Sequence, residues 1–410
     1  MHRTFASARS SRNFRIYLSG HIVSAAGTWI NFTAQSWLVL QLTGSGTALG
    51  LQAALMFGPV LVIGPWGGVI ADKHDKRHIL MVTQVAYAIT ALTLATVVAL
   101  EVVQMWMVYG IGVASGIVTA FDNPARQTFT IEMVGADDLT NAVSLNSAAF
   151  MASRVVGPAI AGLLIASVGI AACFIIDGLS FFAVVAALSS MRTSELHPQT
   201  RTTRVSGHLV AGLRYVWQTL ELRRPLLVMA VVFTLVFQWQ VTVPLLAERV
   251  FGTGPREFGL LSAASGVGAF VGAIWMANRT LQPTMRDLAR WVVVVGVTTT
   301  SVAFAPTLLL AGVALVPLGF AAMAFIITGN TMLQLVARPE ARGRVMALYA
   351  VIFLGSTPFG APAVGWIGEH LGPRISFLLG GGVAVALGLA MSWVRQRGRD
   401  RMADAVVEAG

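Results

Sequence analysis

Long apolar runs follow one another along almost the whole chain, and no other feature constrains the fold as strongly. A helix needs about 20 mostly apolar residues to cross a hydrocarbon core of about 30 Å, and runs of that length recur here with short polar gaps. Of the 410 residues, 56% are hydrophobic and only 11% are charged, which a soluble surface could not tolerate. A membrane β-barrel would need strands of about 10 residues that alternate polar with apolar. The sequence therefore predicts an all-α membrane protein.

Twelve transmembrane helices are predicted from apolar runs bounded by charges or by Gly and Pro turns. They are expected at residues 16–41, 46–71, 79–100, 104–122, 139–167, 170–190, 225–247, 257–278, 288–305, 309–334, 345–369 and 374–394. The longest polar interruption separates the first six from the last six. This predicts an N-terminal six-helix bundle at 1–191, a cytoplasmic central loop at 192–224 and a C-terminal six-helix bundle at 225–410.

Glycines recur at one constant offset in the fifth and eleventh predicted helices. Each set is followed by another apolar span, which is typical of the internal repeats of transporters and predicts two pseudo-symmetric bundles. The alternative is that Gly recurs because small residues let membrane helices approach closely. The matched pairs are Gly157 with Gly360, Gly162 with Gly365, and Gly169 with Gly372.

Lys and Arg lie mostly in the gaps on one side of the predicted membrane. Only Arg249, Arg256 and Arg374 fall on the other side. Because positive residues accumulate in cytoplasmic loops, both termini are expected in the cytoplasm, with the chain crossing the inner cell membrane many times. The net charge of +10 does not indicate a nucleic-acid partner, since these residues alternate with apolar segments instead of forming a soluble basic surface.

A basic turn follows the second predicted helix, with Gly68, Asp72, Lys73, Lys76 and Arg77 as its defining residues. A close-packing Gly, an acid at a helix end and clustered bases suit a tight cytoplasmic turn. The carboxylate there can hold a neighbouring helix N-terminus or a cation.

This turn resembles the signature of the major facilitator superfamily, in which the same loop reads Gly-x-x-x-Asp-Arg/Lys-x-Gly-Arg/Lys-Arg/Lys. Asp75 stands where that family usually has Gly. The segment from Gly157 and Pro158 to Gly162 is similar, except at one position, to the Gly-Pro-x-x-Gly-Gly of the drug-antiporter branch. The resemblance implies a helix-packing motif that seals the outward route, and it favours export.

Four further segments resemble one exporter group, often labelled transmembrane secretion effectors, which includes the enterobactin exporter. They are Gly27–Ile30, Leu42–Ser45, Asp122–Arg126 and Arg342–Val345. The likeness covers almost the whole chain and implies two bundles around a central cavity that work by alternating access. The Arg that drug-proton antiporters place in the fourth helix would fall at Trp106, so the usual route of proton coupling is not predicted.

We expect a charge cluster at the cytoplasmic face to gate the inner side. In it, Asp72, Lys76 or Arg77, and Asp122 would hold the start of the eleventh helix near Arg344. The residues assigned to this cluster and its turn are Gly68, Asp72, Lys73, Lys76, Arg77, Asp122, Arg126 and Arg344.

Ionisable groups inside the membrane are costly and therefore mark function by default. Arg154 and Asp177 fall within the fifth and sixth predicted helices. They form either a fixed pair that joins two helices or a proton-coupling pair in which Asp177 takes up and releases a proton. His21 is a further proton-coupling candidate, or a packing residue. If Asp177 is structural, the coupling site is expected at Asp122, His21 or Glu132.

Uncharged polar and aromatic residues on apolar helices are the candidates for the wall of a substrate cavity. Their chemistry suits a bulky, partly apolar ligand with hydrogen-bonding groups, although each could instead join helices by hydrogen bonds. The candidates are Asn31, Gln35, Asn146, Gln238, Trp239, Gln240, Asn330 and Gln334.

Motifs for phosphate binding, metalloprotease chemistry or Cys/His metal sites are not found in the sequence, so neither an enzyme, a cofactor nor a metal is predicted. The single cysteine, Cys173, is expected to pack. The predicted function is export of a small amphipathic organic molecule of the drug or siderophore class by a monomer, coupled to proton influx. The alternatives are uptake of a small solute, or a lipid-handling or signalling membrane protein that transports no solute.

Overall fold

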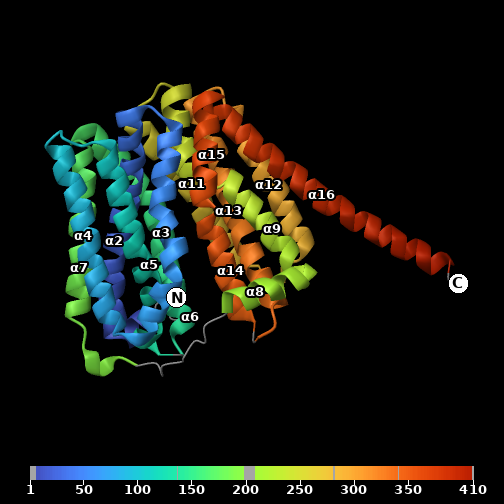
Figure 1. Cartoon of the computed structure of the whole chain (residues 1–410), viewed down its shortest axis with the longest axis horizontal. Helices are drawn as coiled ribbons and strands as arrows, with labels where there is room; N and C mark the ends of the chain where they lie inside the picture. The colour runs from blue at the N-terminus through green and yellow to red at the C-terminus, as the bar shows by residue number, and fades with distance from the viewer. Residues whose placement is uncertain (1–5, 136, 198–207, 280–281, 340, 409–410) are drawn as a thin grey trace.

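The computed structural model describes residues 6–135, 137–197, 208–279, 282–339 and 341–408. Within these ranges the regular structure is entirely helical. Figure 1 shows the helices of the first half of the chain grouped on one side and those of the second half on the other. The first half contains α1 (Ala6–Ser10), α2 (Arg12–Thr43), α3 (Gly46–Lys73), α4 (Lys76–Ala99), α5 (Met105–Val134), α6 (Leu139–Ser167) and α7 (Ile170–Ser189).

The second half repeats this set with two broken helices. A short 3-10 turn, η1 (Thr193–Glu195), lies between the two halves, and the elements of the second half follow it. They are α8 (His208–Gln218), α9 (Leu220–Leu235), α10 (Trp239–Leu245), the π-helical turn η2 (Leu246–Val250), α11 (Pro255–Ala277), α12 (Met285–Ala303), α13 (Leu308–Val336), α14 (Arg342–Gly355), α15 (Thr357–His370) and α16 (Pro373–Glu408).

The seventh predicted helix, 225–247, is broken where the sequence predicted a continuous span. The break between α9 and α10 is closed by Gln238, whose side-chain nitrogen donates to the backbone oxygens of Phe233 at 2.8 Å and Thr234 at 3.3 Å. A side chain thus satisfies carbonyls that the helix leaves unpaired. The eleventh predicted helix likewise divides into α14 and α15 at Ser356.

The central stretch is less irregular than predicted. Helix α8 packs against α9 and α14, and α9 begins at Leu220 instead of residue 225. Residues 198–207 of the predicted loop lie outside the described residues. The bundle limits at residues 191 and 225 stay a prediction.

The fourth predicted helix was expected to end at residue 122, but α5 continues to Val134. Asp122 and Arg126 are therefore inside a helix, not in the loop after it. They are four residues apart and form an ion pair of 2.8 Å, which offsets the cost of placing both charges there.

Ten helical segments in the described part of the chain are long and apolar enough to cross a membrane, counting α9–α10–η2 and α14–α15 as one segment each. The other two predicted spans correspond to α2, with 32 residues, and α12, with 19. Both pack among the spanning helices, α2 against α6 and α7, and α12 against α13 and α16. A helix or broken helix thus stands at each of the twelve predicted places.

The two halves are built alike, as the glycine repeat predicted. Helix α3 packs on α5 as α11 packs on α13, and α4 packs on α7 as α12 packs on α16. Side chains added at Gly157 and Gly360 would meet the first long helix of their own half, α2 and α9. Those at Gly162 and Gly365 would meet the second long helix of the other half, α11 and α3.

The third glycine pair occupies equivalent turns. Gly169 and Gly372 precede α7 and α16 with φ angles of 104° and 101°, a backbone conformation that other residues rarely adopt. The repeat therefore has a structural basis in packing and in turn geometry.

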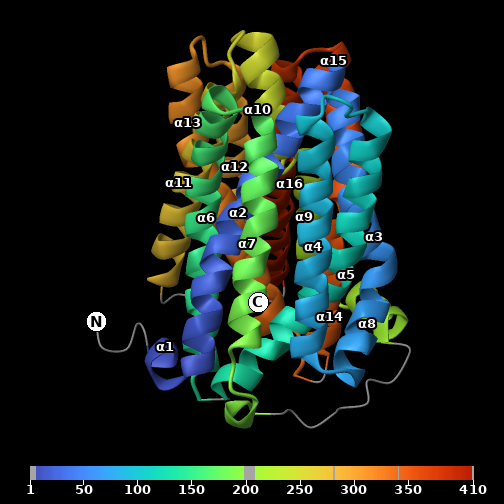
Figure 2. The same cartoon turned by 90° about the vertical axis from the view of Figure 1, so that its left-hand side faces the viewer.

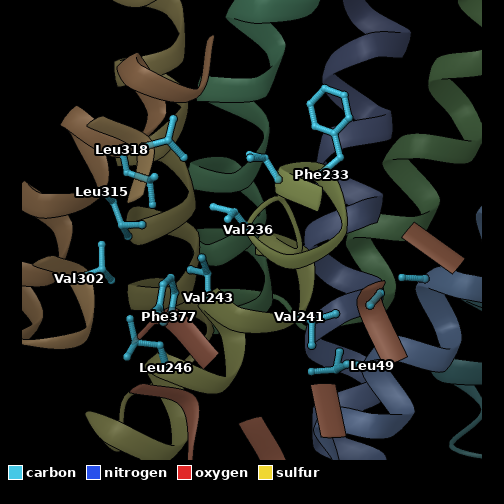
Figure 3. Close-up of a cluster of buried hydrophobic side chains, with 14 of the residues drawn as sticks. Leu49, Phe233, Val236, Val241, Val243, Leu246, Val302, Leu315, Leu318 and Phe377 are labelled. Atoms are coloured by element: carbon cyan, nitrogen blue, oxygen red, sulfur yellow. The ribbon is translucent and has the colours of Figure 1, made fainter. Parts of the chain in front are cut away.

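The turn between α3 and α4 marks one end of the molecule, here called the α3–α4 end, and the turn between α2 and α3 marks the other, the α2–α3 end. Figure 2 shows the long helices running between these ends. A buried apolar cluster surrounds the broken helix α9–α10 and includes Phe233, Val241 and Val243 together with Leu49 of the first half and Leu315 of α13 (Figure 3). The largest core therefore joins the two halves.

Candidate transport site

Contacts between the halves are dense at the α2–α3 end. Helix α3 packs along α15, and a Cβ added to Gly46 would lie 2.5 Å from the Gly365 carbonyl oxygen. The carboxylate of Glu369 accepts hydrogen bonds from Ser45 Oγ at 2.7 Å and from the backbone N–H of Thr47 at 2.9 Å. This acid of α15 thus caps the start of α3 across the interface between the halves.

Arg249 strengthens the same contact from η2. Its guanidinium donates to the backbone oxygen of Glu369 at 2.9 Å and to that of Gly44. Helix α6 packs along α11 nearby, where a Cβ on Gly162 would lie 2.7 Å from the Pro255 oxygen. The α2–α3 end is therefore closed by backbone-close packing and charge-assisted hydrogen bonds.

The α3–α4 end leaves apolar side chains of α3 uncovered. Val62 and Trp66 are 66% and 62% exposed. Around Gly68 of α3 and Gly343 of α14, no atom lies within 4 Å of an added Cβ. Gly67 instead packs on Ala120 of α5, so the close-packing glycine of the motif is Gly67 and not Gly68 as predicted.

The basic turn after α3 is tight, because only His74 and Asp75 separate α3 from α4. Asp75 caps α4 by accepting from the His78 N–H at 3.2 Å. This explains why an acid can stand where the related motif has Gly. Asp72 and Lys73 lie in the last turn of α3.

The expected charge cluster is divided among separate partners in this structure. Lys76 pairs with Glu132 of α5 at 2.5 Å, and Arg77 donates to the backbone oxygen of Leu188 at 2.7 Å. Neither contacts Asp122, which lies deeper along α5 and is paired with Arg126. Arg344 stands in the first turn of α14, where its side chain is partly buried.

Asp122 is the centre of a buried polar network inside the first half. Besides Arg126, it accepts from Thr83 Oγ1 and Gln84 Nε2, both at 2.8 Å. The guanidinium of Arg126 also donates to the Tyr17 hydroxyl at 3.0 Å and lies 3.1 Å from His21 Nδ1. His21 stacks on Tyr17, so it is part of a packed network that joins α2, α4 and α5.

Asp177 has a different environment from Asp122. It is only 3% exposed, and Asn31 Nδ2 donates to its Oδ2 at 2.6 Å. Its Oδ1 is buried without a hydrogen-bond partner and faces Gly27 of α2. Within the described residues no cation pairs with this carboxyl.

The predicted pair between Arg154 and Asp177 is not formed, because α2 lies between α6 and α7. Gly157 of α6 packs on Trp29 of α2, whereas Asp177 packs on another face of α2, at Gly27. The Arg154 guanidinium stacks instead on Trp29, 5.5 Å from the ring centroid, and on Trp239 of α10, at 5.0 Å. A cation of the first half is thus held against an aromatic ring of the second.

A small cavity lies between α2, α3 and α10. Two predicted cavity residues, Gln35 and Gln240, line it. Gln52 of α3 also lines it and donates to Gln35 at 3.0 Å, leaving its own oxygen without a partner. The remaining wall is formed by Phe32, Ser36, Leu49, Ala53 and Met56.

The other cavity candidates lie elsewhere. Gln238 caps α9, as described above, and Asn31 is bound to Asp177. Asn330 accepts from Gln334 at 2.6 Å on α13, in a partly exposed pair. Asn146 of α6 has a buried oxygen without a hydrogen-bond partner.

The Gly157–Gly162 segment lies where the halves meet. Gly157 packs on Trp29, and Gly162 packs on Pro255 and Arg256 of α11. Gly259 of α11 packs in return on the backbone of Pro158. The segment thus contacts α2 on one side and α11 on the other.

Sequence reasoning missed Trp29, Gln52, Glu369, and the residues Thr83 and Gln84 that bind Asp122. Trp29 stood within the Gly27–Ile30 segment that resembles an exporter group, which could have drawn attention to it. Glu369 lies at the end of an apolar helix and gives no signal in sequence, because its partners are more than 300 residues away.

The chain is similar to known transport proteins over most of its length. The family model described as "Transmembrane secretion effector" matches residues 3–406. The multidrug efflux pump Tap of Mycolicibacterium fortuitum is 27% identical over 88% of this chain and 91% of that protein. Macrolide efflux protein A of Streptococcus pyogenes is 22% identical over 92% and 95%. The staphyloferrin A transporter of Staphylococcus aureus is 22% identical over 63% and 66%.

Solved structures agree with the fold. The nucleoside transporter NupG superposes with a TM-score of 0.74 over 93% of this chain and 98% of its own, at 13% identity. Such a likeness supports the arrangement of helices and says nothing about the substrate.

Proposed function

The chain belongs to the transmembrane secretion effectors of the major facilitator superfamily, and from this premise we propose that it exports small amphipathic organic molecules by alternating access. Membership makes it a multi-pass membrane transporter. The proposal adds the direction, the class of substrate, the inner membrane as its location and the inward flow of protons as its energy source.

The observation that carries the proposal is the unequal contact between the two halves. At the α2–α3 end, Glu369 and Arg249 hold the halves together and α3 packs closely along α15, whereas towards the α3–α4 end α3 makes far fewer contacts with α14. A transporter that binds its cargo from one side needs such a conformer, and the reverse conformer releases the cargo. The distribution of basic residues supports a cytoplasmic position for the α3–α4 end, which would suit capture for export.

Export is further supported by two related proteins that are named for efflux, the multidrug efflux pump Tap and macrolide efflux protein A. The amides of Gln35, Gln52 and Gln240 beside Phe32 suit an amphipathic molecule with hydrogen-bonding groups.

Asp177 supports the proposal of proton coupling. A carboxyl buried inside a membrane protein, bound to one amide and to no cation in the described residues, can bind and release a proton as its surroundings change. Asp122 is a weaker candidate, because Arg126, Thr83 and Gln84 already donate hydrogen bonds to its oxygens.

Direction and coupling are tested in cells that express the chain and are loaded with a fluorescent dye while de-energised. On restoring energy, we expect faster dye efflux than in cells with an empty vector, and an uncoupler should abolish the difference. Faster accumulation would indicate uptake instead. If a panel of dyes, antibiotics and siderophores shows no movement in cells or proteoliposomes, the chain handles lipid or signals, and the proposal is wrong.

Orientation is tested separately with a reporter enzyme fused after Gly410. A reporter that works only outside the membrane should be inactive there and active when fused into the turn between α2 and α3 at Gly44. The opposite pattern would reverse the proposed direction.

A further inference from the structure

We propose that Arg154, Trp29 and Trp239 form the binding site for an acidic group of the exported molecule, so that the cargo is an amphipathic organic anion. This inference rests on the proposed function and names its class of substrate. It assigns Arg154 to substrate binding, in place of the ion pair that the sequence predicted.

No acidic side chain of the described residues balances the charge of Arg154. The ion pairs of the described residues join Lys76 to Glu132 and Arg126 to Asp122, and two exposed pairs lie outside the core, but none includes Arg154. Stacking on aromatic faces partly compensates a cation and leaves its net charge unbalanced. A guanidinium inside a membrane protein without an acidic partner is costly, and an incoming anion would remove that cost.

Two indole N–H groups without hydrogen-bond partners belong to the rings beside Arg154. The rings of Trp29 and Trp239 cover the guanidinium, and the indole N–H of each is buried without a hydrogen-bond partner. A guanidinium offers N–H donors in a planar fork that matches a carboxylate. The three side chains therefore lie in contact, and an acidic group bound beside them would balance the cation and accept from an indole N–H within its reach.

The site lies where the two halves of the chain meet. Arg154 and Trp29 belong to the first half of the chain, and Trp239 belongs to the second. The backbone of Arg154 also packs on Gly266 of α11. A ligand bound here contacts both halves at once, so its binding can depend on how the halves are placed, as alternating access requires.

The cavity between α2, α3 and α10 lies beside the Arg154 site. Phe32, which lines it, packs edge-on against Trp29 with ring centroids 5.7 Å apart, and Gln240, which also lines it, directly follows Trp239. Phe150 covers Trp29 on the side of α6, at 5.6 Å. An apolar or aromatic body could thus lie beside Phe32 and Gln240 while its acidic group binds Arg154.

The competing explanation is a brace, in which Arg154 only joins Trp29 to Trp239 and binds no ligand. The two explanations differ in what they predict for charge selectivity. A brace gives no preference between an anion and its neutral analogue, whereas an anion site prefers the anion by a margin that depends on Arg154.

The experiment uses the purified full chain in nanodiscs of zwitterionic lipid and two matched probes, 4-(1-pyrenyl)butyrate and 4-(1-pyrenyl)butanol. Binding is followed by energy transfer from Trp to pyrene, with empty nanodiscs subtracted. We expect the butyrate to bind about tenfold more tightly than the butanol, the scale of a charge-assisted pair of hydrogen bonds. In Arg154→Gln the preference should disappear while the butanol affinity stays unchanged.

Arg279→Gln is the matched control, because Arg279 also lies 5.0 Å from a Trp ring, that of Trp275, but at an exposed position just past the end of α11. It should keep the preference. Arg154→Lys should keep part of it, and Trp239→Phe should reduce it by removing one donor. These two variants also serve if Arg154→Gln does not fold.

The proposal is overturned if the wild type shows no preference for the butyrate, or if Arg154→Gln keeps it. It is also overturned if adding phosphatidylglycerol to the nanodiscs removes the preference in the wild type, since the site would then hold a lipid headgroup. Failure of the proposed function looks different, because the binding preference is measured without transport and survives even if no compound is exported.

Discussion

The carboxylate of Glu369 accepts two hydrogen bonds from Thr47, one from the backbone N–H at 2.9 Å and one from the hydroxyl at 2.6 Å. These residues belong to different halves of the chain, so the pair must separate if the α2–α3 end opens. We predict that Glu369→Gln weakens closure of this end by about 1 kcal/mol, because a neutral amide accepts more weakly than a partly exposed carboxylate.

The measurement is the distance distribution between spin labels at Leu42→Cys and Leu371→Cys, both exposed at this end, in a Cys173→Ser background. The population with the long distance should rise about fivefold in Glu369→Gln. Glu257→Gln is the control, because Glu257 caps its own helix α11 and does not cross between the halves. Equal effects of both changes would contradict a specific contact.

Asp177→Asn is predicted to abolish proton-driven transport and to leave binding of the pyrene probes intact. The amide can replace the carboxyl beside Asn31 but cannot exchange a proton. Transport is measured in proteoliposomes with an imposed pH gradient. Asp287→Asn, at the exposed start of α12, should transport normally. Full gradient-driven transport by Asp177→Asn would move the coupling site to Asp122, His21 or Glu132.

The pair of Asp122 and Arg126 is predicted to stabilise the fold only as a pair. Arg126→Gln should destabilise the protein by about 3 kcal/mol, because it leaves a buried carboxylate without its cation. The double variant Asp122→Asn with Arg126→Gln should recover much of that loss.

Thermal unfolding of the single and double variants checks this prediction. Arg192→Gln is the control, since its ion pair with Glu195 has the same 2.8–2.9 Å spacing but is exposed, and it should change stability by less than about 1 kcal/mol. A double variant that is less stable than Arg126→Gln alone would contradict the prediction.

The positions of the helices could be predicted from the sequence because each apolar run must lie in lipid. The glycine repeat was also informative, since Gly162 and Gly365 mark equivalent contacts between the halves. Both signals are local or periodic. They do not depend on which helices become neighbours.

The partners of the polar residues could not be predicted for that reason. Arg154 and Asp177 lie close in sequence, on consecutive helices, but α2 from the start of the chain separates them. Asp122 was expected at the start of a loop, but α5 continues past it, and Thr83 and Gln84 of α4 donate hydrogen bonds to it. The role of each residue depends on which helices lie side by side in the fold, and the sequence alone does not show this.

Gly67 and Gly68 provide a matched pair to test whether the α3–α4 end closes during transport. A side chain at Gly67 would overlap Ala120 of α5, whereas an added Cβ at Gly68 meets no atom within 4 Å. If this end closes in the reverse conformer, the open surface at Gly68 must meet α14, which already packs against α3. A larger residue at Gly68 would then disfavour only the closed conformer.

We predict that Gly68→Leu folds with normal thermal stability, binds the pyrene probes and transports at least about tenfold more slowly, as a shift of about 1.4 kcal/mol toward the open conformer would cause. Gly67→Leu should instead lose stability by about 1–3 kcal/mol through overpacking. Gly110→Leu, in open space near the other end of α5, should leave both properties unchanged. Transport by Gly68→Leu at the wild-type rate would show that this surface of α3 stays open throughout the cycle.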